Sequence, residues 1–289
     1  MITVESGAFS SVALPCQEMQ AGIVLPTTPV FGGMSTVALL CLVAAFFFTA
    51  GISVVTGGTS LITVPVMLSF GIEPHVAVAT NMVALIFLSL GGTLPFLKGK
   101  QPLRGRLLLL VVLTVVGSLC GAWLLLIVPS KAMPVVIAAA MIAVAIFSLI
   151  NRKAGLATPV ASPSGFTRAA GFASTFVLGI YGGFFSGGYV ALLTGAFIAF
   201  FQLTFIEAVA LTKVLNFFSS LVATLVFAQQ GIIDWRLGLI LSAASFAGAL
   251  FGAVLARRMS NLLLRRIFVT AVILMALKTL ILDVHWANL

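Results

Sequence analysis

The chain contains the same series of short motifs twice, about 130 residues apart. Each series has a single glycine, a glycine pair, an Ala-Val-Ala string with a polar end, and a Gly-x-x-x-Gly motif. The positions are Gly51, Gly57–Gly58, Ala77–Asn81 and Gly117–Gly121 in the first half, and Gly182, Gly187–Gly188, Ala208–Lys213 and Gly248–Gly252 in the second. Because the order is the same and the spacing is nearly constant, we infer that one unit was duplicated. Duplicated apolar units of this size are typical of secondary transporters, which bind their substrate where the two halves meet.

The composition excludes a soluble globular domain. Hydrophobic residues make up 61% of the chain, charged residues only 7%, and the mean hydropathy is +1.26. A soluble domain of 289 residues would need many more charged residues at its surface. The apolar runs are continuous rather than alternating, which favours membrane-spanning helices over a β-barrel. We therefore predict an all-α, multi-pass protein of the bacterial inner membrane.

The net charge of +9 does not indicate a nucleic-acid partner. The basic residues lie in short loops between apolar runs, as the positive-inside rule predicts for the cytoplasmic loops of a membrane protein. The expected partners are the lipid bilayer and a small substrate, and no nucleic acid.

The sequence divides into an N-terminal extension (1–33), a first membrane repeat (34–150), a polar linker rich in Pro, Ser and Gly (151–165) and a second membrane repeat (166–289). The extension has no basic start and no clear apolar stretch, so it does not resemble a signal peptide. About five helical elements are expected in each repeat. They are Ser35–Val55, Thr59–Phe70, His75–Leu97, Leu107–Val128 and Met133–Ile150 in the first, and Phe166–Phe185, Tyr189–Phe201, Phe205–Ala228, Leu237–Ala256 and Leu262–Leu282 in the second.

The second element of each repeat is too short to cross the bilayer. Crossing ~30 Å of hydrocarbon takes about 20 helical residues, whereas Thr59–Phe70 and Tyr189–Phe201 are much shorter. The pairs Gly57–Gly58 and Gly187–Gly188 come just before them, which predicts either a long helix broken at the glycines or a re-entrant hairpin. Unwound backbone at membrane depth is tolerated only where it lines protein or a wet cavity. We therefore place the substrate site at the glycine pairs.

Equivalent loops carry opposite charge signals in the two repeats. In the first repeat the loop before Leu107 is rich in basic residues and the loop at Lys131 is poor, whereas in the second the loop at Arg236 is poor and the next one is rich. The basic residues of the rich segments are Lys98, Lys100, Arg104, Arg106, Arg152, Lys153, Arg168, Arg257, Arg258, Arg265 and Arg266. If rich loops are cytoplasmic, the repeats are inverted and both termini face outside. An even number of crossings per repeat would make the repeats parallel instead.

Motifs of common enzyme and metal sites are absent from the sequence. There is no P-loop and no H-E-x-x-H, and the three isolated cysteines and two distant histidines form no metal-ligand pattern. We therefore expect no cofactor, no metal and no enzymatic activity. Ser186, within Gly183–Gly187, superficially resembles an intramembrane serine nucleophile, but a small residue that eases packing beside glycines is the simpler interpretation.

Lys213 is the single residue that most strongly indicates a binding site. It lies about two turns inside the apolar element Phe205–Ala228, where a charged side chain is costly and normally faces the bundle interior, a cavity or a partner. Alternatively, it extends to the lipid headgroups or pairs with Glu207 on the same helix. Its counterpart in the alignment of the two halves is Asn81.

Neutral polar residues accompany these positions. Thr80, Thr212 and Asn216 could bond only to their own helices, but their place beside Lys213 favours a role in binding. Free N–H groups at helix N-termini, neutral donors and a lysine together suit an anion. The predicted substrate-binding residues are Gly57, Gly58, Thr80, Asn81, Gly187, Gly188, Thr212, Lys213 and Asn216.

Glu73 and Glu207 each stand just before the third element of a repeat. They are either proton-coupling groups, since a partly buried carboxylate can titrate upward, or acids that stabilise the start of a helix. The two Gly-x-x-x-Gly motifs match the small-residue pattern of close helix packing. We expect them to hold the two halves together or to support a homodimer.

The order of these motifs resembles the TauE/SafE sulfite exporter family. The matching segments are Gly51–Pro65, Ala77–Asn81, Glu207–Lys213, Gly231–Trp235, Gly248–Ala253 and the Arg257–Arg258 loop, and the resemblance covers roughly Val37 to Leu282. It implies a permease that exports small sulfur-containing anions such as sulfite or an organosulfonate. The chain departs from the family pattern where the first half ends its motif in Asn81 and has Gly99–Leu103 in place of a Gly-x-x-Asp-Trp turn. This asymmetry argues against two symmetric sites.

Together these features predict a secondary transporter that binds a small sulfur-containing anion between the repeats, near the bilayer midplane, without ATP hydrolysis. A passive anion channel is the first alternative. An intramembrane enzyme that uses Ser186 and a membrane scaffold without transport activity are further alternatives, although neither explains the duplicated helix breaks.

Overall fold

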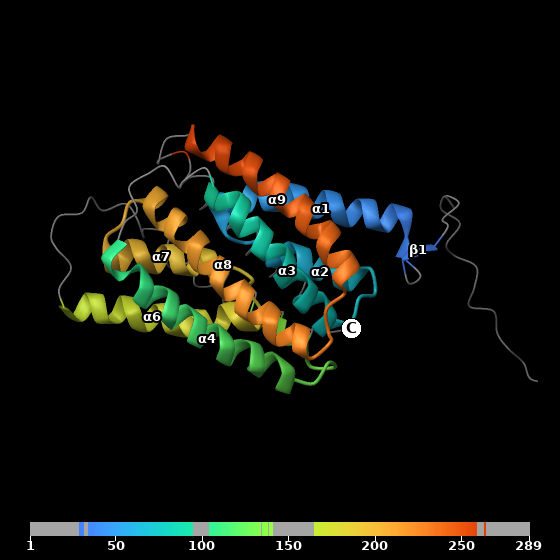
Figure 1. Cartoon of the computed structure of the whole chain (residues 1–289), viewed down its shortest axis with the longest axis horizontal. Coiled ribbons are helices and arrows are strands. Elements are labelled where there is room, and N and C mark those ends of the chain that lie inside the picture. Colours follow the sequence, from blue (N-terminus) through green and yellow to red (C-terminus); the bar gives the residue numbers. More distant parts are fainter. Residues whose placement is uncertain are drawn as a thin grey trace, which may run out of the picture.

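The computed structural model describes residues 29–31, 34–94, 104–133, 135–137, 139–140, 165–258 and 263. Most of the expected N-terminal extension, of the linker, of the fifth element of each repeat and of the basic loops lies outside the described residues. The described part is a bundle of helices, preceded by a short antiparallel pair of strands, β1 (Pro29–Phe31) and β2 (Met34–Ser35) (Figure 1). The predicted all-α class is confirmed.

The helices have nearly the predicted bounds. Those of the first repeat are α1 (Thr36–Thr56), α2 (Ser60–Ser69), α3 (Pro74–Thr93), the 3-10 turn η2 (Arg104–Arg106) and α4 (Leu107–Ile127). Those of the second repeat are α6 (Gly165–Phe184), α7 (Tyr189–Phe201), α8 (Phe205–Gln229) and α9 (Trp235–Arg257). The short second elements of the two repeats are α2 and α7.

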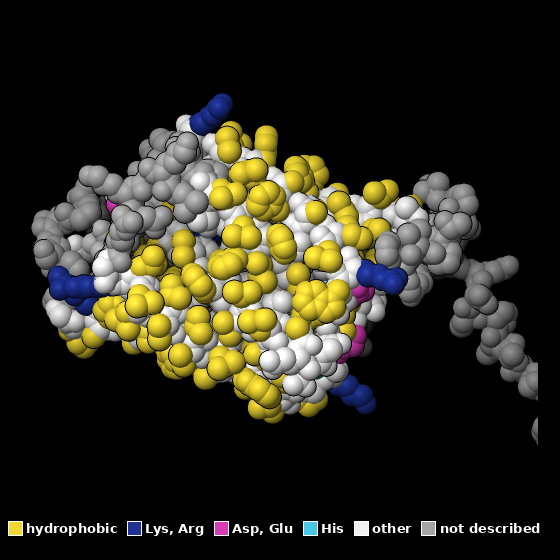
Figure 2. Space-filling view, viewed as in Figure 1, with side chains coloured by type: hydrophobic (Ala, Val, Ile, Leu, Met, Phe, Trp, Pro, Cys, Tyr) yellow, Lys and Arg dark blue, Asp and Glu magenta, His cyan; other side chains and the backbone are white. Residues whose placement is uncertain are grey.

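Five of the described helices are long and apolar enough to cross a membrane, namely α1, α3, α4, α8 and α9. Large apolar side chains such as Phe48, Leu108 and Phe251 are exposed on the bundle, and apolar side chains cover much of the face shown in Figure 2. Charged side chains lie toward the ends of the helices in that view. Since the sides of this protein carry the surface expected of a lipid-facing bundle, the chain is a multi-pass membrane protein.

Helices of each repeat pack against helices of the other repeat. α1 of the first repeat packs along α9 of the second, and α6 of the second packs along α4 of the first. α3 and α8 pack on each other between these pairs (Figure 1). Equivalent helices therefore make equivalent contacts across the boundary, and each repeat completes its core with helices of the other.

Glycines allow the helices of the two repeats to pack closely on each other. A Cβ atom on Gly121 would lie 1.9 Å from the carbonyl oxygen of Ile180 on α6, and one on Gly252 would lie 2.1 Å from the carbonyl oxygen of Gly51 on α1. The predicted Gly-x-x-x-Gly motifs thus bring the backbones of the two repeats into contact, which confirms that they hold the halves together. A homodimer stays a prediction.

The break in each repeat produces a hairpin rather than a continuous span. α1 enters the bundle from one end and α2 returns to that end, whereas α6 enters from the other end and α7 returns there (Figure 1). The re-entrant alternative therefore describes both segments. The sidedness of the protein in a bilayer, and with it the inverted relation of the repeats, stays a prediction.

Similar caps begin the third helix of each repeat. The Glu73 carboxylate accepts a hydrogen bond of 2.9 Å from Val76 N at the start of α3. Thr204 caps α8 and forms a capping box with Glu207. The capping interpretation of both acids is thereby confirmed, and a role in proton coupling stays a prediction.

Candidate functional site

The two helix breaks lie against each other inside the bundle. Gly57 and Gly188 both have left-handed backbone, with φ of 71° and 76°, a conformation that glycine adopts readily. A Cβ atom on Gly57 would lie 2.6 Å from the backbone nitrogen of Ala191, so the end of α1 packs directly on the start of α7. α2 and α7 both start at these breaks, where Leu61 N and Tyr189 N bond back to the carbonyl oxygens of Gly58 and Ser186. The positive dipole ends of two helices therefore lie near each other at this contact.

A small pocket lies beside the meeting point of the breaks. It is lined by Gly57, Thr59, Ser60, Leu85 and Leu88 of the first repeat and by Ser186, Val190, Lys213 and Asn216 of the second. All of these residues are buried in the described part of the chain. Its side-chain polar groups are hydroxyls, one amide and one amine. The two repeats thus form the pocket jointly, as the duplicated sequence predicts.

Lys213 is fully inside the protein, with 1% of its surface exposed. Its Nζ donates a 3.0 Å hydrogen bond to the carbonyl oxygen of Ser53, in the last turn of α1. The aliphatic stem passes Gly92, where a Cβ atom would lie 3.6 Å from Cδ of the lysine. No carboxylate pairs with the amine among the described residues. The alternatives in which Lys213 extends to the headgroups or pairs with Glu207 are therefore wrong, since Glu207 bonds to Thr204 at the start of α8.

Asn216 lies one turn after Lys213 and connects the two central helices. Its Nδ2 donates a 2.7 Å hydrogen bond to Ser89 Oγ on α3. On its other side, Ser186 Oγ makes a long contact of 3.5 Å with Asn216 Oδ1. Ser186 itself has left-handed backbone at the second break, with φ of 63°. The Asn216 amide thus connects α3 to the second helix break beside the pocket.

Asn81 and Thr212 form a second polar layer next to the pocket. Thr63 Oγ1 of α2 donates to Asn81 Oδ1 at 2.8 Å, and Thr194 Oγ1 of α7 lies 3.3 Å from Thr212 Oγ1. Asn81 and Thr212 are separated by the same number of residues as Gly117 and Gly248, and so are Thr63 and Thr194. Asn81 is therefore the counterpart of Thr212. The sequence alignment that paired Asn81 with Lys213 is wrong by one residue, and the counterpart of Lys213 is the buried Met82.

The structure brings only part of the predicted set together. Gly57, Lys213 and Asn216 line the pocket, and Gly58, Gly187 and Gly188 belong to the two breaks beside it. Thr80 faces elsewhere, since its Oγ1 accepts a 3.1 Å hydrogen bond from the backbone nitrogen of Asp234 before α9.

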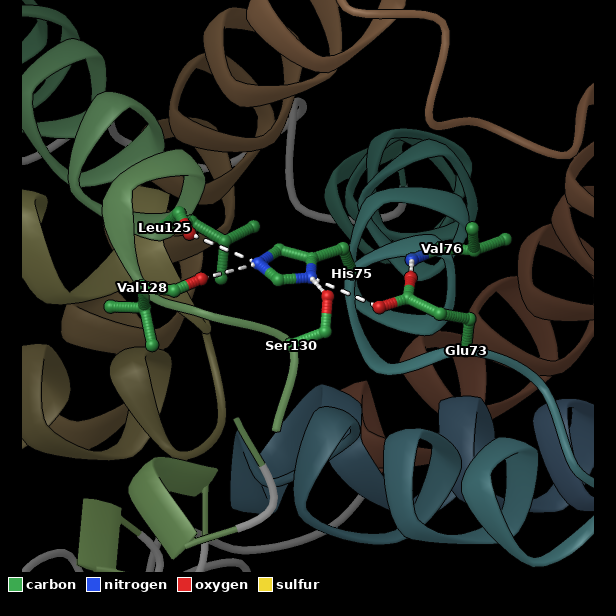
Figure 3. A network of polar contacts seen from close by, with 6 residues as sticks. All are labelled: Glu73, His75, Val76, Leu125, Val128 and Ser130. Carbon is green, nitrogen blue, oxygen red and sulfur yellow. Dashed lines mark hydrogen bonds and ion pairs between the residues drawn. The ribbon is translucent and has the colours of Figure 1, made fainter. Parts of the chain in front are cut away.

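Glu73 belongs to a separate network at the end of the bundle where α3 begins (Figure 3). His75 Nδ1 lies 3.1 Å from Glu73 Oε1 and 3.0 Å from Ser130 Oγ, and Nε2 lies 3.0 Å from the carbonyl oxygen of Val128. Because the serine and the acid contact the same ring nitrogen, this is not a Ser-His-acid relay. Burial raises the pKa of Glu73, but hydrogen bonds from Val76, His75 and Ser130 outweigh burial and leave the pKa below its ordinary value. The network joins α3 to the end of α4.

Sequence reasoning missed the hydroxyls that complete the site. Thr59 and Ser60 line the pocket, and Ser53 supplies the acceptor for Lys213. All three lie within a few residues of the first glycine pair. Polar residues beside a predicted helix break were therefore the sequence signal that could have identified them.

The fold and the site define a class: an α-helical, multi-pass membrane protein of two interlocked repeats, with a small buried pocket between them that is lined by polar groups. The sequence profile of the family described as sulfite exporter TauE/SafE matches residues 42–279. The chain belongs to this family and is a membrane transporter. The match covers both repeats and every residue of the pocket.

Curated relatives have the same general description. The chain is 28% identical over 246 residues to the probable membrane transporter protein ORF9 of a Sinorhizobium species, covering 84% of this chain and 92% of the relative. It is 26% identical over 254 residues to a probable membrane transporter protein of Haemophilus influenzae, covering 88% and 98%. It is 28% identical over 255 residues to the probable membrane transporter protein YfcA of Escherichia coli K12, covering 86% and 93%. No solved structure matches the chain.

Proposed function

We propose that the protein is a carrier for a small sulfur-containing anion, such as sulfite or an organosulfonate, and that the anion binds at Lys213. The observation that carries this proposal is a fully buried amine that, among the described residues, bonds to a single backbone carbonyl, beside a pocket shared by both repeats. A cation at membrane depth is normally paired or functional, and an anionic substrate would supply the missing charge.

The surrounding groups suit the same chemistry. The positive dipole end of α2 lies at the pocket, since Thr59 and Ser60 at the start of this helix line it. Thr59, Ser60 and Ser186 add hydroxyl donors, and the Asn216 side chain adds an amide. A cationic substrate would require carboxylates, and the described residues that line the pocket include none. The family description supports a sulfur oxyanion among the small anions.

The arrangement of the two hairpins supports transport by alternating access. The two re-entrant hairpins open toward opposite ends of the bundle (Figure 1). Their breaks meet beside the pocket. In an inverted repeat, rocking one half against the other exposes a central site to each side in turn. We propose export, because each negative charge that leaves a cell with an inside-negative potential gains ~2.3 kcal/mol per 100 mV.

Flux into proteoliposomes tests the proposal. The purified protein is reconstituted, and the uptake of labelled sulfite, sulfate and an organosulfonate is measured over a range of concentrations. A carrier gives saturable uptake and accelerated exchange when the same anion is inside. Uptake of none of the three would contradict the substrate class.

The remaining alternatives are separated by the same preparation. A passive anion channel would give flux that rises linearly with concentration and shows no exchange. An intramembrane enzyme that uses Ser186 would form a product that Ser186→Ala abolishes. In the structure Ser186 Oγ contacts Asn216 and the Lys213 amine bonds to Ser53, so no nucleophile–base hydrogen bond joins Ser186 to Lys213.

A further inference from the structure

A line of polar side chains on α8 leads away from the pocket. Ser220 and Thr224 follow Asn216 at intervals of four residues, which places all three on one face of the helix. Asn216 lines the pocket and bonds to Ser89 of α3. The line therefore runs from the pocket toward the C-terminal end of α8, along the contact between α8 and α3.

The hydroxyls of Ser220 and Thr224 differ from most of the buried hydroxyls in the bundle. Serine and threonine inside apolar helices normally donate to a carbonyl one turn earlier, as Thr63, Thr194 and Ser242 do here. Ser220 and Thr224 are 0% and 5% exposed, and their hydroxyl oxygens have no hydrogen-bond partner among the described residues. Because a buried hydroxyl without a partner is destabilising, helix packing does not account for them.

The first repeat has an equivalent line on α3. Ser89 and Thr93 follow Leu85, which lines the pocket, and they hold the repeat positions of Ser220 and Thr224. α3 and α8 run in opposite directions through the bundle, so this second line leads from the pocket toward the other end (Figure 1).

We propose that the two lines form the half-pathways by which the anion reaches and leaves the pocket, with Ser220 and Thr224 on one side and Ser89 and Thr93 on the other. This inference rests on the proposed function and extends it to the route. An anion that moves between apolar helices needs donors in place of water, and a hydroxyl without a protein partner donates without first breaking a bond. In an alternating carrier only one of the two lines is hydrated at a time.

Cysteine accessibility tests the route. Single cysteines replace Ser220, Thr224, Ser89 and Thr93 in a chain whose three native cysteines are changed to serine, and a membrane-impermeant maleimide is added to either side of the proteoliposome. Ser220→Cys and Thr224→Cys should react from the side where the exposed marker Gln230→Cys reacts. Ser89→Cys and Thr93→Cys should react from the opposite side, with Arg258→Cys as the marker of that end.

Two control variants next to Thr224 on α8 give the labelling rates to compare with. Leu225→Cys lies next to Thr224 on the exposed face of α8, and Ala223→Cys is buried in the apolar core. Because only a hydrated thiol ionises and reacts, Ser220→Cys and Thr224→Cys should react about tenfold faster than either control. Rates equal to those of the controls, or labelling of both lines from one side, would overturn the route.

A second variant covers the case in which a cysteine prevents folding. Thr224→Val keeps the shape of the side chain and removes the hydroxyl, so the unfolding temperature should stay the same or rise, while maximal anion flux should fall several-fold. Unchanged flux would contradict the route. Labelling requires no transported anion, so a correct labelling pattern without flux of any tested anion would refute the proposed substrate and leave the route standing. Saturable flux with control-level labelling would refute the route alone.

Discussion

The Nζ of Lys213 donates a 3.0 Å hydrogen bond to the carbonyl oxygen of Ser53, which joins α8 of the second repeat to the end of α1 in the first. The same carbonyl accepts the backbone N–H of Gly57 at 2.8 Å, directly at the helix break. The amine therefore lies at the negative end of the α1 dipole. An anion that pairs with Lys213 would compete with this carbonyl, and this competition would couple binding to the position of α1.

Gly57→Ala should impair transport and stability more than Gly71→Ala. Both positions have left-handed backbone, with φ of +71° and +79°, where alanine costs about 1 kcal/mol. Only Gly57 also has a close neighbour, because a Cβ atom there would lie 2.6 Å from Ala191 N, whereas nothing lies within 4 Å of one on Gly71. Thermal unfolding in detergent and anion flux measure the two variants. Equal losses would contradict direct contact between the breaks.

Gly252→Ala should destabilise the bundle by about 1–3 kcal/mol, the usual cost of overpacking. Its new methyl group would lie 2.1 Å from the carbonyl oxygen of Gly51, which cannot move without separating α9 from α1. Gly238→Ala on the same helix is the control, since its Cβ atom would make an ordinary contact of 3.5 Å with Thr80. Chemical unfolding in detergent measures the difference. If the two variants are equally stable, the glycine contacts do not hold the repeats together.

Glu73→Gln should lower stability at neutral pH and have a smaller effect in acid. Burial raises the pKa of Glu73, but hydrogen bonds from Val76, His75 and Ser130 outweigh burial and leave the pKa below its ordinary value of 4.5. A carboxylate with a lowered pKa in the folded state stabilises that state above pH 4.5, and the stabilisation is lost as the pH falls through the lowered pKa. The unfolding temperatures of wild type and variant should therefore converge in acid. A difference that grows in acid would contradict this network.

Glu207→Gln tests whether Glu207 only caps α8 or also couples transport to protons. The carboxylate accepts hydrogen bonds from the backbone and side chain of Thr204 at 3.0 and 2.8 Å, in the first turn of α8 and not at the pocket. Loss of a cap costs about 1 kcal/mol of stability, so we expect slightly lower stability and an unchanged pH dependence of flux. Thr204→Ala, which removes the other half of the capping box, should behave alike. Loss of the pH dependence in Glu207→Gln alone would instead assign proton coupling to this residue.

The helix breaks could be predicted from the sequence because their physical requirement is visible there. The left-handed backbone at Gly57 and Gly188 favours glycine, and the close approach of Gly57 to Ala191 leaves no room for a Cβ atom. The exchange of helices between the repeats was not predicted, because packing partners depend on the path of the chain. The Gly-x-x-x-Gly motifs indicated close contacts without indicating which helices make them.

The site was predicted only in part, for two reasons. The hydrogen-bond partner of Lys213 is Ser53, 160 residues away, and sequence spacing carries no information on such a contact. The similar Ala-Val-Ala strings also suggested an alignment shifted by one residue. The bonds that Asn81 and Thr212 make to equivalent threonines show the register without a gap. The polar site is therefore more asymmetric than the alignment predicted, since Lys213 corresponds to an apolar methionine.

Anion uptake by proteoliposomes that contain wild type, Lys213→Met or Met82→Leu tests the central claim most directly. Lys213→Met copies the residue at the equivalent place in the first repeat, so it removes the charge with little change in volume, and Met82→Leu is the matched control. We expect saturable uptake by wild type and Met82→Leu. Lys213→Met should remain folded and lose affinity about a hundredfold, since losing one partner of a buried charge pair costs about 3 kcal/mol. Uptake by Lys213→Met at the wild-type rate and affinity would contradict an anion site at Lys213.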